Sequence, residues 1–187
     1  MYLFAFLICL SSFGQKKKSV TTKSSNGLAK IDNLIAEIKN GNFQISISNK
    51  GKVVDTICIK KVDKSLPETC KITPFNANGT KLYLITWTEK SNIKTDLKTE
   101  DKSFVYSNIY ELSTKKKVFF NTQLTNNIVE KVFLDTNKTA SETQTRVRRE
   151  GYEFILNPDG TIIQKTAKQL NKFKYDASTA SFIDAKK

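Results

Sequence analysis

The stretch Lys81-Leu82-Tyr83-Leu84-Ile85-Thr86-Trp87-Thr88-Glu89 decides the fold that this sequence predicts. It is rich in aromatic and β-branched residues and follows Asn78-Gly79, so it predicts a β-strand. Successive side chains of a strand point to opposite faces, so the two leucines share one face, and Tyr83, Ile85 and Trp87 share the other. Because both faces are apolar, we expect a central strand that is covered on both sides, with Trp87 in the core.

Most of the remaining chain alternates short apolar segments with turn residues, which is typical of antiparallel strands. Asn49-Lys50-Gly51 and Asn157-Pro158-Asp159-Gly160 are typical of tight hairpin turns. Besides the central strand, we expect strands over residues 43–47, 53–62, 71–73, 104–112, 118–124, 128–134, 152–156, 161–164, 172–175 and 181–183.

One segment has the period of a helix. Its apolar residues recur at the i, i+3, i+4, i+7 spacing of a single helical face. They are Leu28, Ile31, Leu34, Ile35 and Ile38. Ser25 or Asn26 would cap the start of this helix, and Asn40-Gly41 would end it. The predicted fold is therefore mainly β: an antiparallel meander that forms a sandwich or an open barrel, with one N-terminal amphipathic helix packed on it.

Two segments, residues 78–83 and 109–114, resemble strands from exported β-propeller repeats. The order of expected strands, loops and turns also suggests two repeated units, one over residues 81–120 and one over residues 131–164. A propeller needs at least four blades, and only about two such units fit in the chain. A single meander is the simpler interpretation.

The N-terminus has the pattern of a secretion signal. Tyr2 to Leu10 is almost wholly apolar, and Ser12 and Gly14 supply the small residues that a signal peptidase needs before a cut at Gln15. The apolar run is shorter than the roughly 20 residues that span a bilayer. Its Ser-Phe-Gly-Gln ending resembles leaders of exported Bacteroidota proteins. An uncleaved anchor and a buried N-terminal strand are the alternatives.

These features predict a signal peptide over residues 1–14 and a flexible linker over 15–25. A single antiparallel β domain would follow over 26–187. The mature chain, without a transmembrane span, would then be periplasmic or extracellular. In that oxidising setting Cys58 and Cys70 predict a disulfide that closes a loop, with two free thiols as the alternative.

The chain carries 31 Lys and Arg against 18 Asp and Glu, a formal charge of +13. The lysines are spread along the chain in short runs, which favours a solvated basic surface and disfavours a nucleic-acid site. A basic module that binds an anionic polymer is the functional alternative.

Histidine is absent from the sequence, which excludes histidine-based triads, histidine-ligated zinc and histidine general bases. No phosphate-binding or calcium-binding loop motif occurs, so we expect no cofactor and no metal. A glycosidase-like site built on a carboxylate pair is still compatible with the sequence. Its candidates are Glu111, Glu130, Asp135, Glu150 and Glu153.

All three arginines of the chain lie close together, at Arg146, Arg148 and Arg149. The planar guanidinium suits bidentate binding of carboxylate, sulfate or phosphate, so these residues are the candidate anion or glycan site. In an extended segment Arg146 and Arg148 would share a face. The alternative interpretation is an edge strand that is protected by its charges.

Three aromatic residues, Trp87, Tyr106 and Tyr110, would make a sugar platform if they were exposed, although their strand positions favour the core. Together these observations predict an exported protein without catalytic activity, with a binding or accessory role. Its partner would be an envelope protein or an anionic glycan. The competing hypotheses are a small carboxylate-dependent enzyme and a basic module for an anionic polymer.

Overall fold

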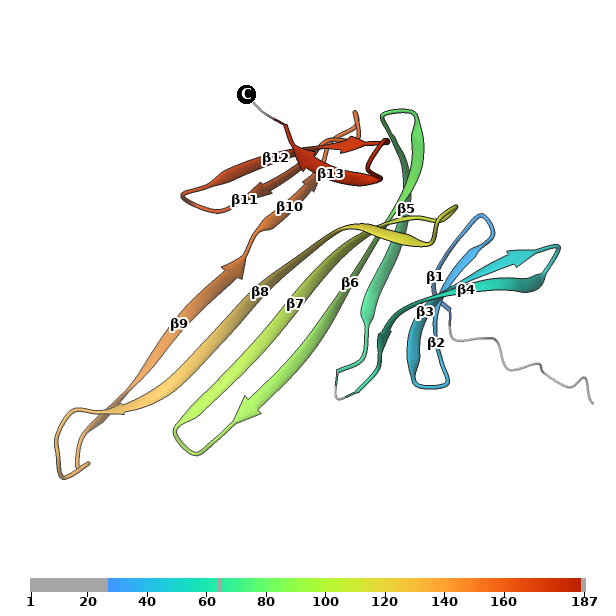
Figure 1. Cartoon of the computed structure of the whole chain (residues 1–187). Coiled ribbons are helices and arrows are strands. Elements are labelled where there is room, and N and C mark those ends of the chain that lie inside the picture. The colour runs from blue at the N-terminus through green and yellow to red at the C-terminus, as the bar shows by residue number, and fades with distance from the viewer. Residues whose placement is uncertain (1–26, 64, 186–187) are drawn as a thin grey trace, which may run out of the picture.

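The structure is a computed structural model that describes residues 27–63 and 65–185. The predicted signal peptide and linker lie outside the described residues, in which all strand pairs are antiparallel, so the mainly β class is confirmed. Strands pair in chain order within three sheets (Figure 1). No helix in this part of the chain is long and apolar enough to cross a membrane.

The N-terminal sheet consists of β1 (Gly27–Ile31), β2 (Leu34–Lys39), β3 (Asn42–Asn49) and β4 (Lys52–Lys61). The central sheet consists of β5 (Glu68–Ala77), β6 (Thr80–Lys94), β7 (Lys98–Glu111), β8 (Lys116–Phe133) and β9 (Ser141–Gly151). The C-terminal sheet consists of β10 (Glu153–Leu156), β11 (Ile162–Lys165), β12 (Leu170–Asp176) and β13 (Ser181–Asp184).

Strand β6 contains the predicted central strand, and it is covered on both faces. On one face Trp87 and its neighbours form a core with Phe43 and Ile45 of the N-terminal sheet. On the other face Leu84 and its neighbours form a second core with Ile162 of the C-terminal sheet. The central sheet is therefore the middle layer of three, as the apolar pattern on both faces of β6 predicted (Figure 1).

Beyond this covered part, strands β6 to β9 extend as a single layer (Figure 1). Strand β5 pairs with β6 only as far as Thr88. We call the uncovered part, residues 90–104 and 124–150, the tongue. Strand β8 runs through it without a break, so the two strands predicted over 118–124 and 128–134 are one, and the proposed repeat does not hold.

The predicted N-terminal helix is wrong. Its residues form the hairpin of β1 and β2, in which Asp32 has a φ of 48° at the turn. Asn40 and Gly41 have φ of 50° and 73° and link β2 to β3 in a tight hairpin. An Asn-Gly pair with two positive φ angles is the signature of a type I′ turn, so this pair joins strands where the sequence was interpreted as a helix end.

The predicted disulfide is also wrong, because Cys58 and Cys70 are free thiols. Cys58 is exposed and opposes Gln44 in the β3–β4 ladder. Cys70 is partly buried and packs against the core between the N-terminal and central sheets. Side chains alternate along β4, which places Ile57 in that core and turns Cys58 away from it.

The two thiols should differ sharply in reactivity. Burial raises the pKa of the Cys70 thiol to about 11, so almost none of it is thiolate near neutral pH. We expect iodoacetamide to modify Cys58 readily in the native protein and Cys70 roughly a hundredfold more slowly. Unfolding in urea should equalise the two rates. If neither residue reacts until a reductant is added, the thiols are bridged and this description is incorrect.

The C-terminal sheet approaches the central sheet closely at the turn before β11. Gly160 has a φ of 80°, and a Cβ atom there would lie 2.5 Å from the carbonyl oxygen of Asn76 and 2.8 Å from the Cα of Ala77. Gly79 has a similar φ of 77°, but a Cβ there would meet nothing within 4 Å. A substitution at Gly79 would therefore cause backbone strain alone, whereas one at Gly160 would add steric overlap.

Gly160→Ala should destabilise the protein considerably more than Gly79→Ala. Both variants place alanine at a positive φ, which costs about 1–2 kcal/mol. Only Gly160→Ala also forces two packed backbones apart, at a further cost of about 1–3 kcal/mol. Urea unfolding of both variants measures the difference. Equal losses would show that the C-terminal sheet does not sit against β5 as described.

Candidate functional site

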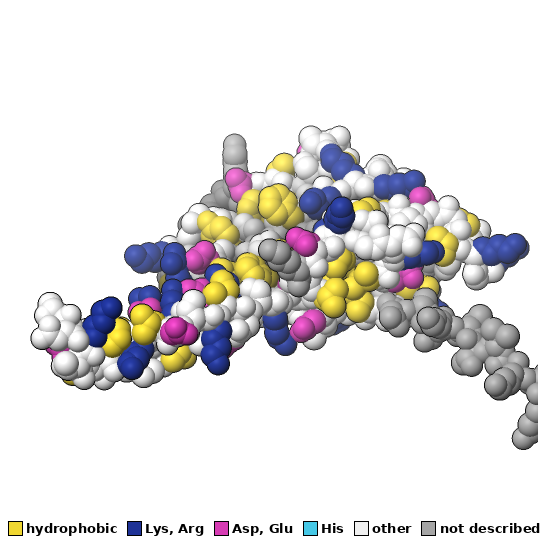
Figure 2. Space-filling view, turned by 90° about the horizontal axis from the view of Figure 1, so that it is seen from below, with side chains coloured by type: hydrophobic (Ala, Val, Ile, Leu, Met, Phe, Trp, Pro, Cys, Tyr) yellow, Lys and Arg dark blue, Asp and Glu magenta, His cyan; other side chains and the backbone are white. Residues whose placement is uncertain are grey.

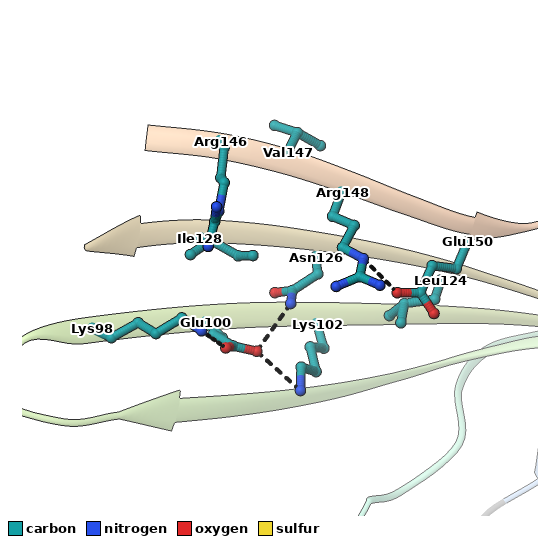
Figure 3. A pocket seen from close by; sticks show the side chains of 10 residues that line it. All are labelled: Lys98, Glu100, Lys102, Leu124, Asn126, Ile128, Arg146, Val147, Arg148 and Glu150. Carbon is teal, nitrogen blue, oxygen red and sulfur yellow. Dashed lines mark hydrogen bonds and ion pairs between the residues drawn. The ribbon is translucent and has the colours of Figure 1, made fainter. Parts of the chain in front are cut away.

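One face of the tongue is hollowed into a groove of about 680 Å³, on the same face as Trp87. Figure 2 shows basic and acidic side chains interspersed along this part of the molecule. We call this hollow the tongue groove; Figure 3 shows it from close by. Its lining comes from β7, β8 and β9: Lys98, Glu100, Lys102, Leu124, Asn126, Ile128, Arg146, Val147, Arg148 and Glu150.

The strand register brings these residues together in rungs. Lys102, Asn126 and Arg148 lie directly opposite one another on β7, β8 and β9. The next rung, two residues farther along the strands, joins Glu100 and Arg146 across β8. Successive rungs on one face are about 6.7 Å apart. Strand β8 supplies a partly apolar floor, while β7 and β9 supply charged walls.

The β7 wall is organised around Glu100. Its carboxylate accepts hydrogen bonds from Lys98, from Lys102 at 3.0 Å and from the Asn126 side-chain nitrogen at 2.9 Å. The hydrogen bonds from the two lysines and the amide lower the pKa of Glu100 to about 2. Glu100 is therefore ionised at any ordinary pH, and it holds both ammonium groups at the groove.

The β9 wall carries two guanidinium groups. Arg146 lies 3.3 Å from the Glu130 carboxylate, and the Arg148 Nε forms an ion pair with Glu150 at 2.7 Å. The arginine side chains are nevertheless 61% and 70% exposed. A guanidinium has five N–H donors, so each arginine keeps donors for a further acceptor.

Asn126 lies on the floor between these walls and is only 6% exposed. Its side-chain nitrogen donates to Glu100, but its oxygen, also buried, has no hydrogen-bond partner among the described residues (Figure 3). A buried acceptor without a donor costs about 1–3 kcal/mol. The arrival of an O–H or N–H donor at the floor would remove that penalty.

The predicted arginine site is divided in two. Arg146 and Arg148 share the groove face, as the strand period predicted. Arg149 points to the other face, where it lines a separate hollow of about 660 Å³ together with Lys165 and Lys168. The three arginines therefore do not converge on one ligand.

Two of the candidate carboxylates, Glu130 and Glu150, lie too far apart for a glycosidase pair. Glu130 and Glu150 share a face, but Glu130 opposes Gln144, six residues from Glu150. That offset corresponds to roughly 20 Å, against the 5–9.5 Å that glycosidases need. Glu111 accepts a hydrogen bond from Thr114. The other two, Asp135 in the loop before β9 and Glu153 on β10, lie apart from the groove.

The pKa is lowered at six carboxyl groups, the opposite of what a general acid needs: Asp55, Glu89, Glu100, Asp135, Asp159 and Asp176. Asp135, for example, accepts hydrogen bonds from Thr139 that lower its pKa. Groups of three or more His, Cys, Asp or Glu that would hold a metal ion are absent from the part of the chain that the structure describes.

The aromatic platform is not available either. Trp87 and Tyr110 are only 3% and 4% exposed, so both belong to the core, as the strand pattern favoured. Tyr106 is partly buried and stacks on Trp87 with ring centroids 4.8 Å apart. Phe104 continues this stack toward the tongue, 6.2 Å from Tyr106.

A buried ion pair closes the covered end of this face. Glu89 is 2% exposed and accepts hydrogen bonds from Lys60 at 2.8 Å, Ser65 at 2.7 Å and the Trp87 indole at 2.8 Å. Burial by itself would raise the pKa of Glu89, but these hydrogen bonds outweigh it and lower the pKa. Because Lys60 belongs to β4, the pair ties the N-terminal sheet to the central sheet.

Sequence reasoning missed the groove residues Lys98, Glu100, Lys102 and Asn126. Their only sequence signal is the alternation of charged with small polar residues along two expected loops. Comparison of the chain with protein-family models, with curated proteins and with solved structures gives no match.

Proposed function

We propose that this chain is a non-catalytic binding protein whose tongue groove holds an anionic glycan. The observation that carries the proposal is the pair of walls, which present Lys98, Lys102, Arg146 and Arg148 over a partly apolar floor. Arginine forks suit the carboxylate or sulfate groups of acidic sugars. The groove volume is in the usual range for ligand sites, about 300–1,000 Å³.

The floor supports a sugar in two ways. Leu124 is partly exposed and offers apolar surface for the C–H face of a sugar ring, while Ile128 beside it is only 4% exposed. Between them, the buried oxygen of Asn126 would accept a hydrogen bond from a ring hydroxyl. The groove lining contains no aromatic side chain on which a nucleic-acid base would stack, which favours a glycan over a nucleic acid.

A binding role also fits the state of the carboxylates. Glu100 and Glu150 are engaged by basic side chains in the groove, and Glu100 stays ionised because its pKa is so low. Neither is poised to give a proton to a leaving group. Export is part of the proposal: with a leader over residues 1–14, the protein would meet such glycans in the periplasm or outside the cell.

A pair of double variants with equal charge changes tests the proposal. Lys102→Gln with Arg146→Gln removes one cation from each wall, while Lys39→Gln with Lys61→Gln removes two exposed cations of the N-terminal sheet. We expect calorimetry with polygalacturonate to show a loss of about tenfold or more in affinity for the first pair only. Neutral dextran should not bind.

Equal losses for both double variants would mean that bulk charge, not the groove, attracts the polymer. Binding of dextran as tight as that of polygalacturonate would show that the arginine and lysine walls play no part. Urea unfolding of each variant checks that the fold is kept, since these surface substitutions should change stability by only about 0.5 kcal/mol.

A further inference from the structure

Strand β9 has a long free edge. All eleven of its residues are exposed, and among the described strands only β8 pairs with it. Figure 1 shows it at the outer margin of the tongue. Alternate residues of such a strand turn their N–H and C=O groups outward, which leaves them ready to pair with another strand.

The edge lacks two features by which proteins often block such pairing, proline and a bulge, although five of its eleven residues are charged. It contains no proline and no lysine, and its ladder with β8 runs from Ser141 to Gly151 without a bulge. Arg146 and Arg148 lie on the groove face, where they pair with Glu130 and Glu150. These two arginines therefore do not point along the free edge and do not block it. The interpretation of β9 as a charge-protected edge is the alternative to pairing with a further strand.

From this edge and its charge pattern, we infer that β9 pairs antiparallel with β9 of a second copy of this chain. Opposite residues of an antiparallel pair share a face. One residue of the strand can therefore lie opposite the same residue of the second copy, with the two-fold axis midway between them, and we name each register by that residue. An axis at Thr145 places Glu142 opposite Arg148 of the second copy, and Arg148 opposite its Glu142. Gln144 then faces Arg146, and Thr143 faces Val147, so like charges are not opposed anywhere along the ladder.

Neighbouring registers fit less well. An axis at Gln144 would also pair Glu142 with an arginine, Arg146, but its ladder would cover only residues 141–147, against 141–149 for the axis at Thr145. An axis at Arg146 would place the two Arg146 residues opposite each other and Glu142 opposite Glu150. An axis at Val147 would oppose Arg146 and Arg148. Directly opposed like charges destabilise a cross-strand pair. The Thr145 register joins the two five-stranded central sheets into one and continues the groove face of each copy into that of the other.

Charge reversal tests this register. Light scattering should show the wild-type protein passing from monomer to dimer as its concentration rises. Glu142→Arg and Arg148→Glu should each raise the dissociation constant about tenfold, since each opposes like charges twice per dimer. The double variant restores both pairs and should recover wild-type affinity. Lys39→Glu, on the N-terminal sheet, should leave the dissociation constant unchanged.

Circular dichroism confirms that each variant is folded. A wild-type protein that stays monomeric at every concentration overturns the inference, as does a dimer that ignores both reversals or is not restored by the double variant. If the protein is monomeric but a Glu-Thr repeat peptide slows hydrogen exchange in β9, the edge takes a strand from another protein, and the inference is again wrong.

Discussion

Replacing Trp87 with alanine is expected to lower the free energy of unfolding by about 3–5 kcal/mol, a large part of the 5–15 kcal/mol that stabilises a typical domain. The indole is 3% exposed. Its ring centroid lies 5.2 Å from that of Phe43 in an edge-on arrangement, and 4.8 Å from that of Tyr106, on which it stacks. Its N–H also donates to the buried carboxylate of Glu89. The variant would lose ring packing and would leave Glu89 with one donor fewer.

Two further variants separate these effects. Trp87→Phe keeps a ring between Phe43 and Tyr106 but removes the N–H, so it should cost less than the alanine variant. Phe120→Ala removes an aromatic ring that is 67% exposed and should change stability by only about 0.5 kcal/mol. Urea unfolding measures all three. An alanine variant at Trp87 as stable as the wild type would show that β6 is not covered on this face.

Lys60→Met should be nearly as damaging, because it leaves the Glu89 carboxylate buried without its counter-ion. Breaking a buried ion pair by removing one partner typically costs about 3–5 kcal/mol. Ser65 and Trp87 would still donate to Glu89, and Lys60 itself is 31% exposed, so the lower end of that range is expected. Adding Glu89→Gln removes the unpaired charge and keeps an acceptor for Trp87, so the double variant should recover much of the loss.

The pH dependence of the free energy of unfolding shows whether the Lys60–Glu89 ion pair stabilises the fold. The pKa of Glu89 is lowered in the folded protein, so its contribution is fully present above the unfolded value of about 4.5 and is lost as the pH falls below it. Without Lys60, burial should raise the pKa of Glu89 above 4.5. The gap in stability between wild type and Lys60→Met should therefore shrink on acidification. A gap that is independent of pH would exclude a charged Glu89 as its cause.

The sequence predicted the layered β architecture because one short segment carries the information. Tyr83, Ile85 and Trp87 on one face of β6, with leucines on the other, require cover on both sides. The hairpin turns that contain Gly51 and Gly160 were equally predictable. Both glycines have a φ of 80°, a conformation that favours glycine. Such local signals do not depend on the rest of the fold.

The N-terminal hairpin was not predictable in the same way. Leu28, Ile31, Leu34 and Ile38 follow the helical spacing, yet a turn at Asp32 resets the phase between β1 and β2. On β2 alone the pattern has period two, with Leu34 and Ala36 fully buried. Six residues of strand are too few to distinguish the two periods, and pairing with β3 decides between them.

The tongue and its groove could not be predicted without knowing the strand register. Strand β9 is exposed along its whole length, so it has no apolar alternation to mark it as a strand. It forms because the edge of β8 offers an unbroken ladder. The shared face of Arg146 and Arg148 followed from strand period alone. The lysines and Asn126 that complete the site come from β7 and β8, 20 or more residues away in the chain, and only the strand pairing brings them opposite the arginines.

Hydrogen exchange followed by mass spectrometry, with and without polygalacturonate, tests the groove most directly because it locates the ligand on the chain. The account predicts slower exchange in peptides that cover residues 98–104, 124–130 and 144–150, with the N-terminal and C-terminal sheets unchanged. Protection spread over lysine-rich segments throughout the chain, or none in the tongue while the polymer is bound, would contradict the assignment of the groove as the binding site.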